Sequence, residues 1–163
     1  MIREAVADDV PVILSLVREL ATYEREPEAV VATAESLHTA LFGPSPRVHC
    51  LVAADDSTGD VVGFAAYFVN FSTWLGVHGI YLEDLFVRPV ARGAGHGRAL
   101  LVELARIAVD RGYGRVEWAV LDWNTPAQGF YEALGAKPMD EWTVWRLTGD
   151  ALDRLAAATP RLS

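Results

Sequence analysis

The sequence predicts a single α/β domain built on one mixed, largely antiparallel sheet. Strand-like apolar segments follow one another through residues 49–87 with short turns between them, as in an antiparallel meander. A glycine-rich turn then leads into an amphipathic helix, and another strand follows that helix, as in a βαβ crossover. With 52% hydrophobic and 22% charged residues, the 163-residue chain has enough apolar side chains for one core. We therefore expect one domain over residues 1–163.

The first part of the chain predicts a short strand and two helices. Residues 2–6 are mostly apolar and form the strand. Apolar residues then recur at helical spacing, which predicts a helix over residues 9–23 with Asp8 or Asp9 as its cap. Residues 34–41 indicate a second, shorter helix, which a Gly-Pro-Ser-Pro run stops.

Three strands follow these helices. Residues 49–54 and 61–71 are apolar and rich in β-branched and aromatic side chains, and the polar turn between them predicts a hairpin. Residues 77–87 form the third strand. Pro89 closes it, because proline cannot donate a hydrogen bond to a ladder.

The last part of the chain alternates helices and strands. After the glycine-rich turn, leucine and alanine at helical spacing predict a helix that ends at Gly112. Residues 116–121 predict a strand and residues 125–134 a short helix. Residues 142–147 alternate in polarity and predict a final strand, and residues 150–158 indicate a terminal helix.

The composition argues against several kinds of partner. The formal net charge is −8 and no run of Lys or Arg occurs, so we expect no nucleic acid partner. The same charge suits a cationic substrate, although many soluble domains are acidic for solubility alone. No apolar run approaches the roughly 20 residues of a membrane helix, so we expect no membrane partner. No export signal is visible, and a cytoplasmic location is the expectation.

Cysteine and histidine usage predicts neither a disulfide nor a metal site. Cys50 is the single cysteine and lies in an apolar strand, where it is expected to be part of the core. The four histidines, at positions 38, 49, 78 and 96, do not have metal-ligand spacing.

The glycine-rich turn at residues 93–97 is typical of an anion site. Glycines at positions 93, 95 and 97 leave the first-turn N–H groups and the positive end of the helix dipole open. Arg92 and Arg98 flank the turn and can add charge. Alternatively, the glycines only let the helix pack closely. The dinucleotide-binding pattern does not fit, because Arg98 stands where its third glycine would be, and the Gly-Lys-Ser/Thr of an NTPase loop is absent.

A second stretch that could take part in binding or catalysis covers residues 122–136. Asn124 directly follows a predicted strand and can cap the next helix. Tyr131 lies seven positions further, about two helical turns along. Read only as structure, Phe130 and Tyr131 cover the sheet.

Together these stretches resemble the GCN5-related N-acetyltransferase (GNAT) superfamily. The family's acetyl-CoA signature, Arg/Gln-x-x-Gly-x-Gly/Ala, is matched by Arg92, Gly95 and Gly97. Its second signature, an Asn followed by Phe-Tyr and a Gly, is matched by Asn124, Phe130, Tyr131 and Gly135. The resemblance spans essentially the whole chain. It implies the GNAT fold, an α/β (α+β) arrangement with a centrally splayed sheet and helices on both faces.

Within that superfamily the chain is similar to the spermidine/spermine and thialysine acetyltransferases. The matching runs are Glu-Leu-Ala-Thr-Tyr-Glu at 19–24, Tyr-Leu-Glu-Asp-Leu-Phe-Val at 81–87 and Trp-Asn-x-Pro at 123–126. The polyamine enzymes carry an acid two residues before the tryptophan matched here by Trp74, where this chain has Ser72. A shorter amine, such as a diamine or a lysine-like amino acid, is therefore at least as good a candidate as a long polycation.

The resemblance implies acetyl-CoA as co-substrate. The third strand would hold the pantetheine arm where it splays from its neighbour at a bulge, and an N–H near Val87 would polarise the thioester oxygen. Backbone N–H groups of the glycine turn would hold the pyrophosphate, and the imidazole of His96 would be incidental. The residues assigned to the cofactor are Leu85, Phe86, Val87, Arg92, Gly93, Ala94, Gly95, His96, Gly97, Arg98, Asn124, Thr125, Pro126, Ala127 and Tyr131.

Two residues are the implied catalytic groups. Tyr131 matches the family's general acid, which protonates the departing sulfur, with packing as the alternative role. Glu83 and Asp84 are consecutive carboxylates in an apolar strand, where unpaired burial is costly. Either each finds an Arg or backbone partner near the strand end, or both line the substrate cleft. In the second case Glu83 is the best candidate to accept the ammonium proton, directly or through water.

Three other side chains are candidate acceptor contacts. Glu24 matches an acidic substrate contact of the branch and has Tyr23 beside it, but a solvated helix end is an equal alternative. Trp74 either stacks on an alkyl-ammonium chain or only packs. The aromatic residues at 142–145 suggest core or a subunit interface rather than a ligand site.

These assignments imply an N-acetyltransferase that acts on a primary amine of a small cationic molecule by direct attack in a ternary complex. The alternatives are acetylation of a protein N-terminus or lysine, acetylation of an aminoglycoside, and a non-catalytic acetyl-CoA sensor. The presence of both Tyr131 and Glu83 favours catalysis. The resemblance also implies a homodimer. The sequence does not identify the physiological amine or the nitrogen that is acetylated.

Overall fold

The computed structural model describes residues 1–158. The chain forms two compact units, Met1–Ala119 and Val120–Ser163. The first unit contains the sheet and the helices that cover it, and residues 120–158 of the second contain two nine-residue helices.

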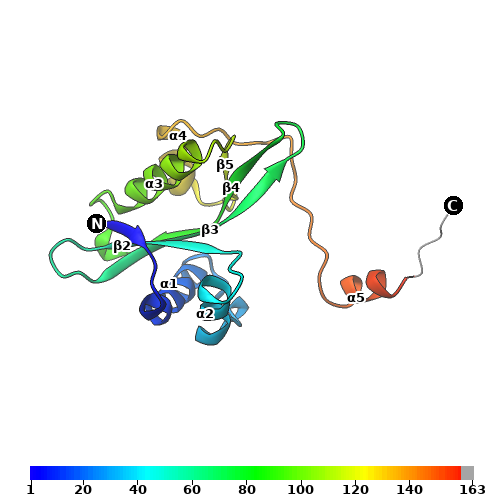
Figure 1. The fold of residues 1–163 in the computed structure, drawn as a ribbon, viewed down its shortest axis with the longest axis horizontal. Helices are drawn as coiled ribbons and strands as arrows, with labels where there is room; N and C mark the ends of the chain where they lie inside the picture. The colour runs from blue at the N-terminus through cyan, green and yellow to red at the C-terminus, as the bar shows by residue number, and fades with distance from the viewer. Residues whose placement is uncertain (159–163) are drawn as a thin grey trace. The chain divides into compact units, whose positions relative to one another are not determined.

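A five-stranded sheet forms the centre of the first unit, with the strands in sequence order (Figure 1). The first four strands pair antiparallel, and β5 pairs parallel with β4. This mixed, largely antiparallel sheet confirms the predicted fold class. The strands are β1 (Ile2–Glu4), β2 (His49–Ala54), β3 (Val61–Ser72), β4 (Val77–Val87) and β5 (Val116–Glu117).

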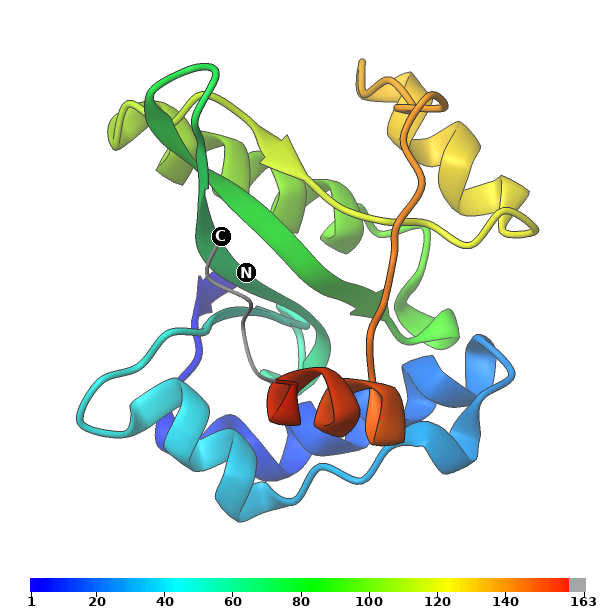
Figure 2. The same cartoon turned by 90° about the vertical axis from the view of Figure 1, so that its right-hand side faces the viewer.

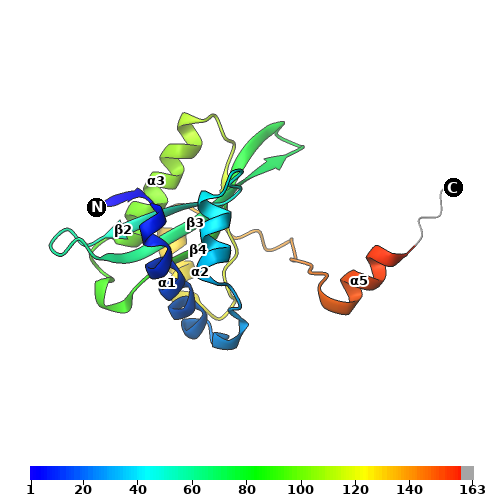
Figure 3. The same ribbon diagram turned by 60° about the horizontal axis from the view of Figure 1, so that its bottom comes forward.

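Helices cover both faces of the sheet, as predicted. In Figure 1, α1 (Val10–Tyr23) and α2 (Ala34–Phe42) lie on one side and α3 (His96–Asp110) lies on the other. Figure 3 brings α1 and α2 in front of the strands. On the α1 face, the apolar stripe of the helix packs on strand residues that alternate along the sheet. The core cluster on this face comprises Ile13, Leu16, Leu20, Cys50, Val52, Val61, Phe64 and Phe86.

Three single turns of 3-10 helix connect these elements. They are η1 (Ala7–Asp9), η2 (Pro27–Ala29) and η3 (Pro89–Ala91). Asp9, one of the two predicted capping residues, is the N-cap of α1, but its side chain makes no cap bond to the helix. Its carboxylate instead accepts hydrogen bonds from the Val6 N–H at 2.8 Å and from the Arg3 guanidinium at 2.6 and 2.9 Å. The Arg3 bond is the main reason that the Asp9 pKa lies below its ordinary value.

A one-residue bulge interrupts the pairing of β3 with β4. Ala66 pairs with Asp84 and the next residue, Tyr67, pairs with Leu82. In the part of the chain that the structure describes, Glu83 is therefore left without a cross-strand partner. An extra residue of this kind bends a strand locally and re-aims its side chains.

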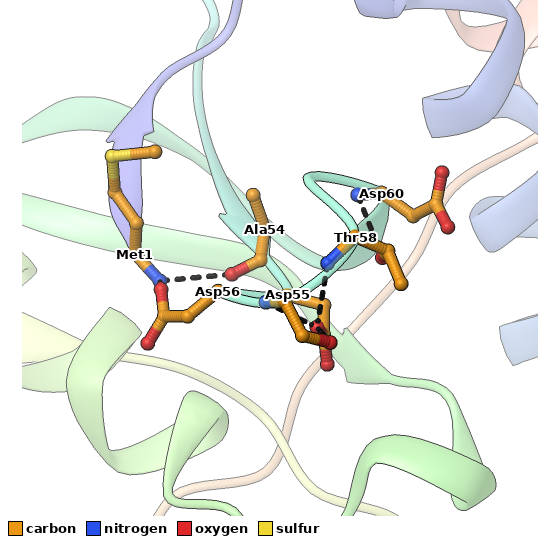
Figure 4. Close-up of polar contacts among 7 residues, drawn as sticks. Met1, Ala54, Asp55, Asp56, Thr58 and Asp60 are labelled. Carbon is orange, nitrogen blue, oxygen red and sulfur yellow. Dashed lines mark hydrogen bonds and ion pairs between the residues drawn. The ribbon is translucent and has the colours of Figure 1, made fainter.

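The turn between β2 and β3 is held by local hydrogen bonds (Figure 4). The Asp55 carboxylate accepts from the N–H groups of Ser57 at 2.8 Å and Thr58 at 3.2 Å. Bonds from Ser57 are the main cause of the lowered Asp55 pKa. Directly before β1, the Met1 nitrogen donates to the Ala54 carbonyl at 2.8 Å. These contacts fix the connection between the first three strands.

The second unit contains α4 (Thr125–Ala133), the yellow helix of Figure 2, and α5 (Gly149–Ala157). The predicted strand at residues 142–147 is wrong, because residues 134–148 form no strand. Trp142 and Trp145 are 66% and 91% exposed there. The preceding predicted strand, 116–121, is shortened to β5. Alternating polarity does not make a strand unless a neighbour accepts its hydrogen bonds.

Candidate active site

The glycine turn before α3 has the geometry of an anion-binding helix start. Gly93 and Gly95 have φ values of +85° and +83°, a region that residues with a Cβ rarely adopt. Gly95 is the N-cap of α3 and supplies no side-chain bond to the first-turn N–H groups. A Cβ built at either glycine would meet nothing within 4 Å. Close packing is therefore not the reason for these two glycines, whereas an open row of N–H groups suits a phosphate.

The neighbouring edge of β4 is open beyond the short ladder with β5. Among the described residues, that ladder has two pairs, Ile80 with Val116 and Tyr81 with Glu117. The strands are therefore splayed after Tyr81, as the resemblance implies. The Arg88 N–H bonds the Val62 carbonyl on β3. Because alternate residues of an antiparallel strand turn their amides to the partner, Leu85 and Val87 turn theirs to the open edge.

The three predicted cofactor residues on β4 lie in different surroundings. The backbones of Leu85 and Val87 lie at the open edge, where they can bind an extended ligand. Phe86 is 4% exposed and its ring belongs to the core cluster beneath α1. The adjacent Val87 carbonyl accepts a hydrogen bond from Arg92 Nε at 3.0 Å.

Three carboxylates gather where β4 bulges, and together they are called the acidic group below: Glu24, Glu83 and Asp84. Asp84 is partly buried, and its pKa is raised to about 6, first by burial and then by repulsion from Glu83 and Glu24. Burial also raises the pKa of Glu24. Glu83, the unpaired bulge residue, is exposed.

None of the ion pairs found within residues 1–158 involves the acidic group. The structure therefore gives no support to the alternative that each carboxylate has an arginine partner near the strand end. The group is a concentration of uncompensated negative charge, partly withdrawn from water. Such a site attracts a cation, and most strongly one with more than one charge.

Trp74 lies away from the acidic group within one chain. It is 87% exposed in the turn between β3 and β4, a hairpin that extends past β2 (Figure 3). Glu83 lies six positions along β4 from Val77, a span of about 20 Å. Ser72 is 8% exposed and accepts a hydrogen bond from the Leu75 N–H at 3.2 Å, so it shapes this turn.

In the second unit, the residues of the second signature form the start of α4. Asn124 Oδ1 accepts a hydrogen bond from the Ala127 N–H at 3.4 Å, which confirms the predicted cap. Thr125, Pro126 and Ala127 form the first turn of the helix. Tyr131 is partly exposed, and its ring centroid lies 5.3 Å from that of Phe130.

One ion pair beside the site was not predicted from the sequence. Arg88, directly after β4, donates to both carboxylate oxygens of Glu19 on α1 at distances of 2.8 to 3.1 Å. This bond is the main cause of the lowered Glu19 pKa. The sequence shows Glu19 as a single acid beside the apolar stripe of α1, but this does not reveal its partner, which lies 69 residues further along the chain.

The described residues contain no cluster of three or more His, Cys, Asp or Glu side chains arranged to hold a metal ion. They also contain no helix with the length and hydropathy needed to cross a membrane.

A family model described as the acetyltransferase (GNAT) family matches residues 13–136. The chain belongs to the GNAT acetyltransferase family. Residues 13–136 include the acidic group, the glycine turn and the start of α4, so this acetyltransferase has each of these features within the matched region.

Among curated proteins, this acetyltransferase is similar to the thialysine N-epsilon-acetyltransferase of Bos taurus, with 41% identity over 165 residues and 96% of each chain covered. An L-ornithine N5-acetyltransferase of Arabidopsis thaliana is 35% identical over 94% of this chain and 86% of its own length. A solved integron cassette protein of V. cholerae has a TM-score of 0.80 and 28% identity, with 97% of this chain and 98% of that chain covered. This likeness supports the fold described above.

Proposed function

We propose that this acetyltransferase transfers the acetyl group of acetyl-CoA to a primary amine of a small cationic molecule, such as a diamine, a polyamine or a lysine-like amino acid. The observation that carries the proposal is the acidic group at the β4 bulge, next to an open strand edge and a glycine turn suited to phosphate. Similar proteins named for thialysine and ornithine acetylation support the same class of acceptor.

The residues present fit acetyl-CoA. The open edge at Leu85 and Val87 offers backbone groups to an extended pantetheine arm, and the turn at residues 93–98 offers N–H groups to a pyrophosphate. Acetyl-CoA supplies an activated thioester when bound. The Val87 N–H is positioned on the open edge, where it would polarise the thioester oxygen as charge develops on it. Asn124 and Thr125–Ala127 remain proposed cofactor contacts on the strength of the second signature.

Two side chains are proposed to move protons. Glu83 is exposed and unpaired in the bulge, so it can accept the ammonium proton of the acceptor directly or through water. Tyr131 is the proposed donor of a proton to the departing sulfur, on the basis of its position in the second signature. The buried Cys50 is not a candidate nucleophile, since burial raises its pKa to about 12. The amine therefore attacks directly, without an acyl-enzyme.

Asp84, Glu24 and Tyr23 are proposed to bind the rest of the acceptor. A partly buried acidic group with no ion-pair partner among residues 1–158 favours an acceptor that carries a second positive charge beside the reacting amine. Ser72 stands where the polyamine enzymes carry an acid, and its hydroxyl accepts a hydrogen bond within the β3–β4 turn. An acceptor shorter than a long polyamine therefore suffices. Trp74 remains a proposed acceptor contact, but not beside the acidic group of its own chain.

An acceptor panel tests the proposal. Thiol release from acetyl-CoA would be measured with diamines, polyamines and lysine analogues, and with monoamines of equal chain length as matched controls. We expect turnover with the dications and at least a tenfold lower kcat/KM with the monoamines. Equal rates would contradict the role of the acidic group. Turnover only with peptides or aminoglycosides would identify another acceptor, and cofactor binding without turnover on any amine would indicate a sensor.

Three further properties are proposed. The chain is one acetyltransferase domain over residues 1–163, supported by a family match that extends into both compact units; residues 159–163 lie outside the described part. It is a homodimer, supported by the exposed apolar side chains of the β3–β4 hairpin, Phe71, Trp74 and Leu75. It acts in the cytoplasm, with neither nucleic acid nor membrane as partner and without a metal.

A further inference from the structure

The side chain of Arg92 is directed at α1 and β4. Its guanidinium carbon lies 5.0 Å from the ring centroid of Tyr23 and 5.7 Å from that of Phe86. Its Nε donates to the Val87 carbonyl at 3.0 Å. Arg92 opens the glycine turn, so one side chain joins three segments: the turn, the end of β4 and the last residue of α1.

Tyr23 is directly followed by Glu24, a member of the acidic group. A contact that holds the Tyr23 side chain restricts the backbone at the end of α1, and so limits where the Glu24 carboxylate can lie relative to Asp84. A planar guanidinium stacked on an aromatic ring is a directional contact that an ammonium group does not reproduce.

A second contact attaches the same end of α1 to the same stretch of chain. The Arg88–Glu19 ion pair lies one helical turn before Tyr23 and four residues before Arg92. Because the ion pair already joins α1 to β4, the Arg92 contact is not needed to hold the helix on the sheet. Its specific effect is on the last residue of α1 and on the acid that follows.

We propose that Arg92 is a positioning residue for the amine acceptor: its side chain holds Tyr23, and through it Glu24, in place beside Asp84. The backbone amides of the glycine turn, rather than this guanidinium, then provide the main contacts to the pyrophosphate. The inference deepens the proposed function and rests on it, since it assumes that the acidic group binds the amine and the glycine turn binds acetyl-CoA.

Substitutions at Arg92 and Tyr23 test this assignment. Arg92→Gln removes the charge and the stack, and Arg92→Lys keeps the charge but loses the planar group. We expect both to raise the amine KM by about two- to fivefold, the range of an exposed cation–π contact. The dissociation constant of CoA, measured by calorimetry, should change by less than the amine KM does. Arg18→Gln, an exposed arginine on α1, is the matched control and should change neither.

A double-substitution cycle separates the Tyr23 contact from a general effect of Arg92. In a Tyr23→Phe background the ring remains, so Arg92→Gln should still raise the amine KM. In a Tyr23→Ala background the ring is gone, so Arg92→Gln should have no additional effect. Circular dichroism verifies the folding of each variant. If Arg92→Gln does not fold, the amine KM is measured with Arg92→Lys instead.

Two results would overturn the inference. One is an unchanged amine KM together with a CoA affinity that Arg92→Gln lowers and Arg92→Lys restores, the behaviour of a phosphate ligand. The other is an Arg92→Gln effect of equal size in the presence and absence of the Tyr23 ring. Failure of the wild-type protein to bind CoA or to acetylate any cationic amine would refute the proposed function instead, which is a distinguishable outcome.

Discussion

Asp84 is proposed to bind the acceptor, but its ionised carboxylate lowers the stability of the fold. Its carboxylate is partly buried next to two other acids, and its pKa is raised from 3.8 to about 6 as a result. The folded protein thus binds a proton at this position in a pH range where the unfolded chain has released it. Ionisation of Asp84 opposes folding, so the contribution of this group to stability is lost as the pH rises from about 4 through 6.

Asp84→Asn is expected to stabilise the protein at neutral pH and to leave it unchanged near pH 4. The expected gain at pH 7.5 is on the order of 2 kcal/mol, because the substitution removes the cost of ionising a partly buried carboxyl. Urea unfolding at several pH values measures it, with the exposed Asp8→Asn as control. The same variant should raise the amine KM. A gain in stability of equal size at both pH values would contradict the electrostatic explanation.

Tyr131→Phe removes one hydroxyl and tests the proposed proton donor. We expect kcat to fall by about 100-fold, the lower range for loss of a general acid, with little change in the dissociation constant of acetyl-CoA. Stopped-flow or steady-state thiol release gives kcat, and calorimetry gives the affinity. Tyr113→Phe in the first unit is the matched control. Unchanged turnover would show that Tyr131 has no role as an acid.

At the scale of elements, the glycine turn is defined by its backbone conformation rather than by lack of space. Gly95 and Gly112 both have positive φ values, +83° and +68°, and a Cβ at either meets nothing within 4 Å. Only Gly95 lies at the proposed pyrophosphate site, whereas Gly112 follows the other end of α3. The pair therefore offers a controlled comparison.

Gly95→Ala and Gly112→Ala should each destabilise the protein by about 1 kcal/mol, the cost of a Cβ in this conformation. Gly95→Ala alone should weaken CoA binding, by about tenfold, because a shifted turn loses charge-assisted hydrogen bonds. Thermal unfolding and calorimetry provide the two measurements. Equal CoA affinity in the two variants would argue against a phosphate site at this turn.

Most helices and strands are predictable from the sequence, but the contacts between them are not. The apolar stripe of α1 and the runs of β2 and β4 are predicted within a residue or two, because periodicity reports directly on burial. The strand predicted at residues 142–147 is wrong, since pairing depends on a neighbour that periodicity does not reveal. The open edge came from the family resemblance, and the acidic group was partly visible as Glu83-Asp84 in an apolar strand. The directions of Arg92 and Arg88 depend on contacts with α1 and could not be predicted.

For the whole molecule, the proposed homodimer is supported by exposed apolar side chains on the β3–β4 hairpin. Phe71, Trp74 and Leu75 are 53%, 87% and 55% exposed on the hairpin that extends past β2. Burying such a patch against a second copy is favourable, by roughly 25 cal/mol per Å² of apolar area.

Leu75→Asp is expected to convert a dimer into a monomer, because it places a charge in that buried surface. Light scattering after size-exclusion chromatography measures the mass of both proteins. Val31→Asp, at a position that is 89% exposed, is the control and should leave the mass unchanged. A wild-type protein that is monomeric at micromolar concentration would contradict the homodimer.

The bulge has a consequence for how this protein tolerates insertions and deletions. Because Glu83 is an extra residue, its deletion would leave Leu82 paired with Tyr67 and Asp84 paired with Ala66, and the register of every other pair would survive. The shortened chain would keep its core and fold with a straight β4. We expect it to lose the local bend of β4 that a bulge produces, and with it the open edge that is proposed to bind acetyl-CoA. We therefore expect acetyl-CoA binding to depend on the number of residues between Leu82 and Asp84 more than on the identity of the residue between them.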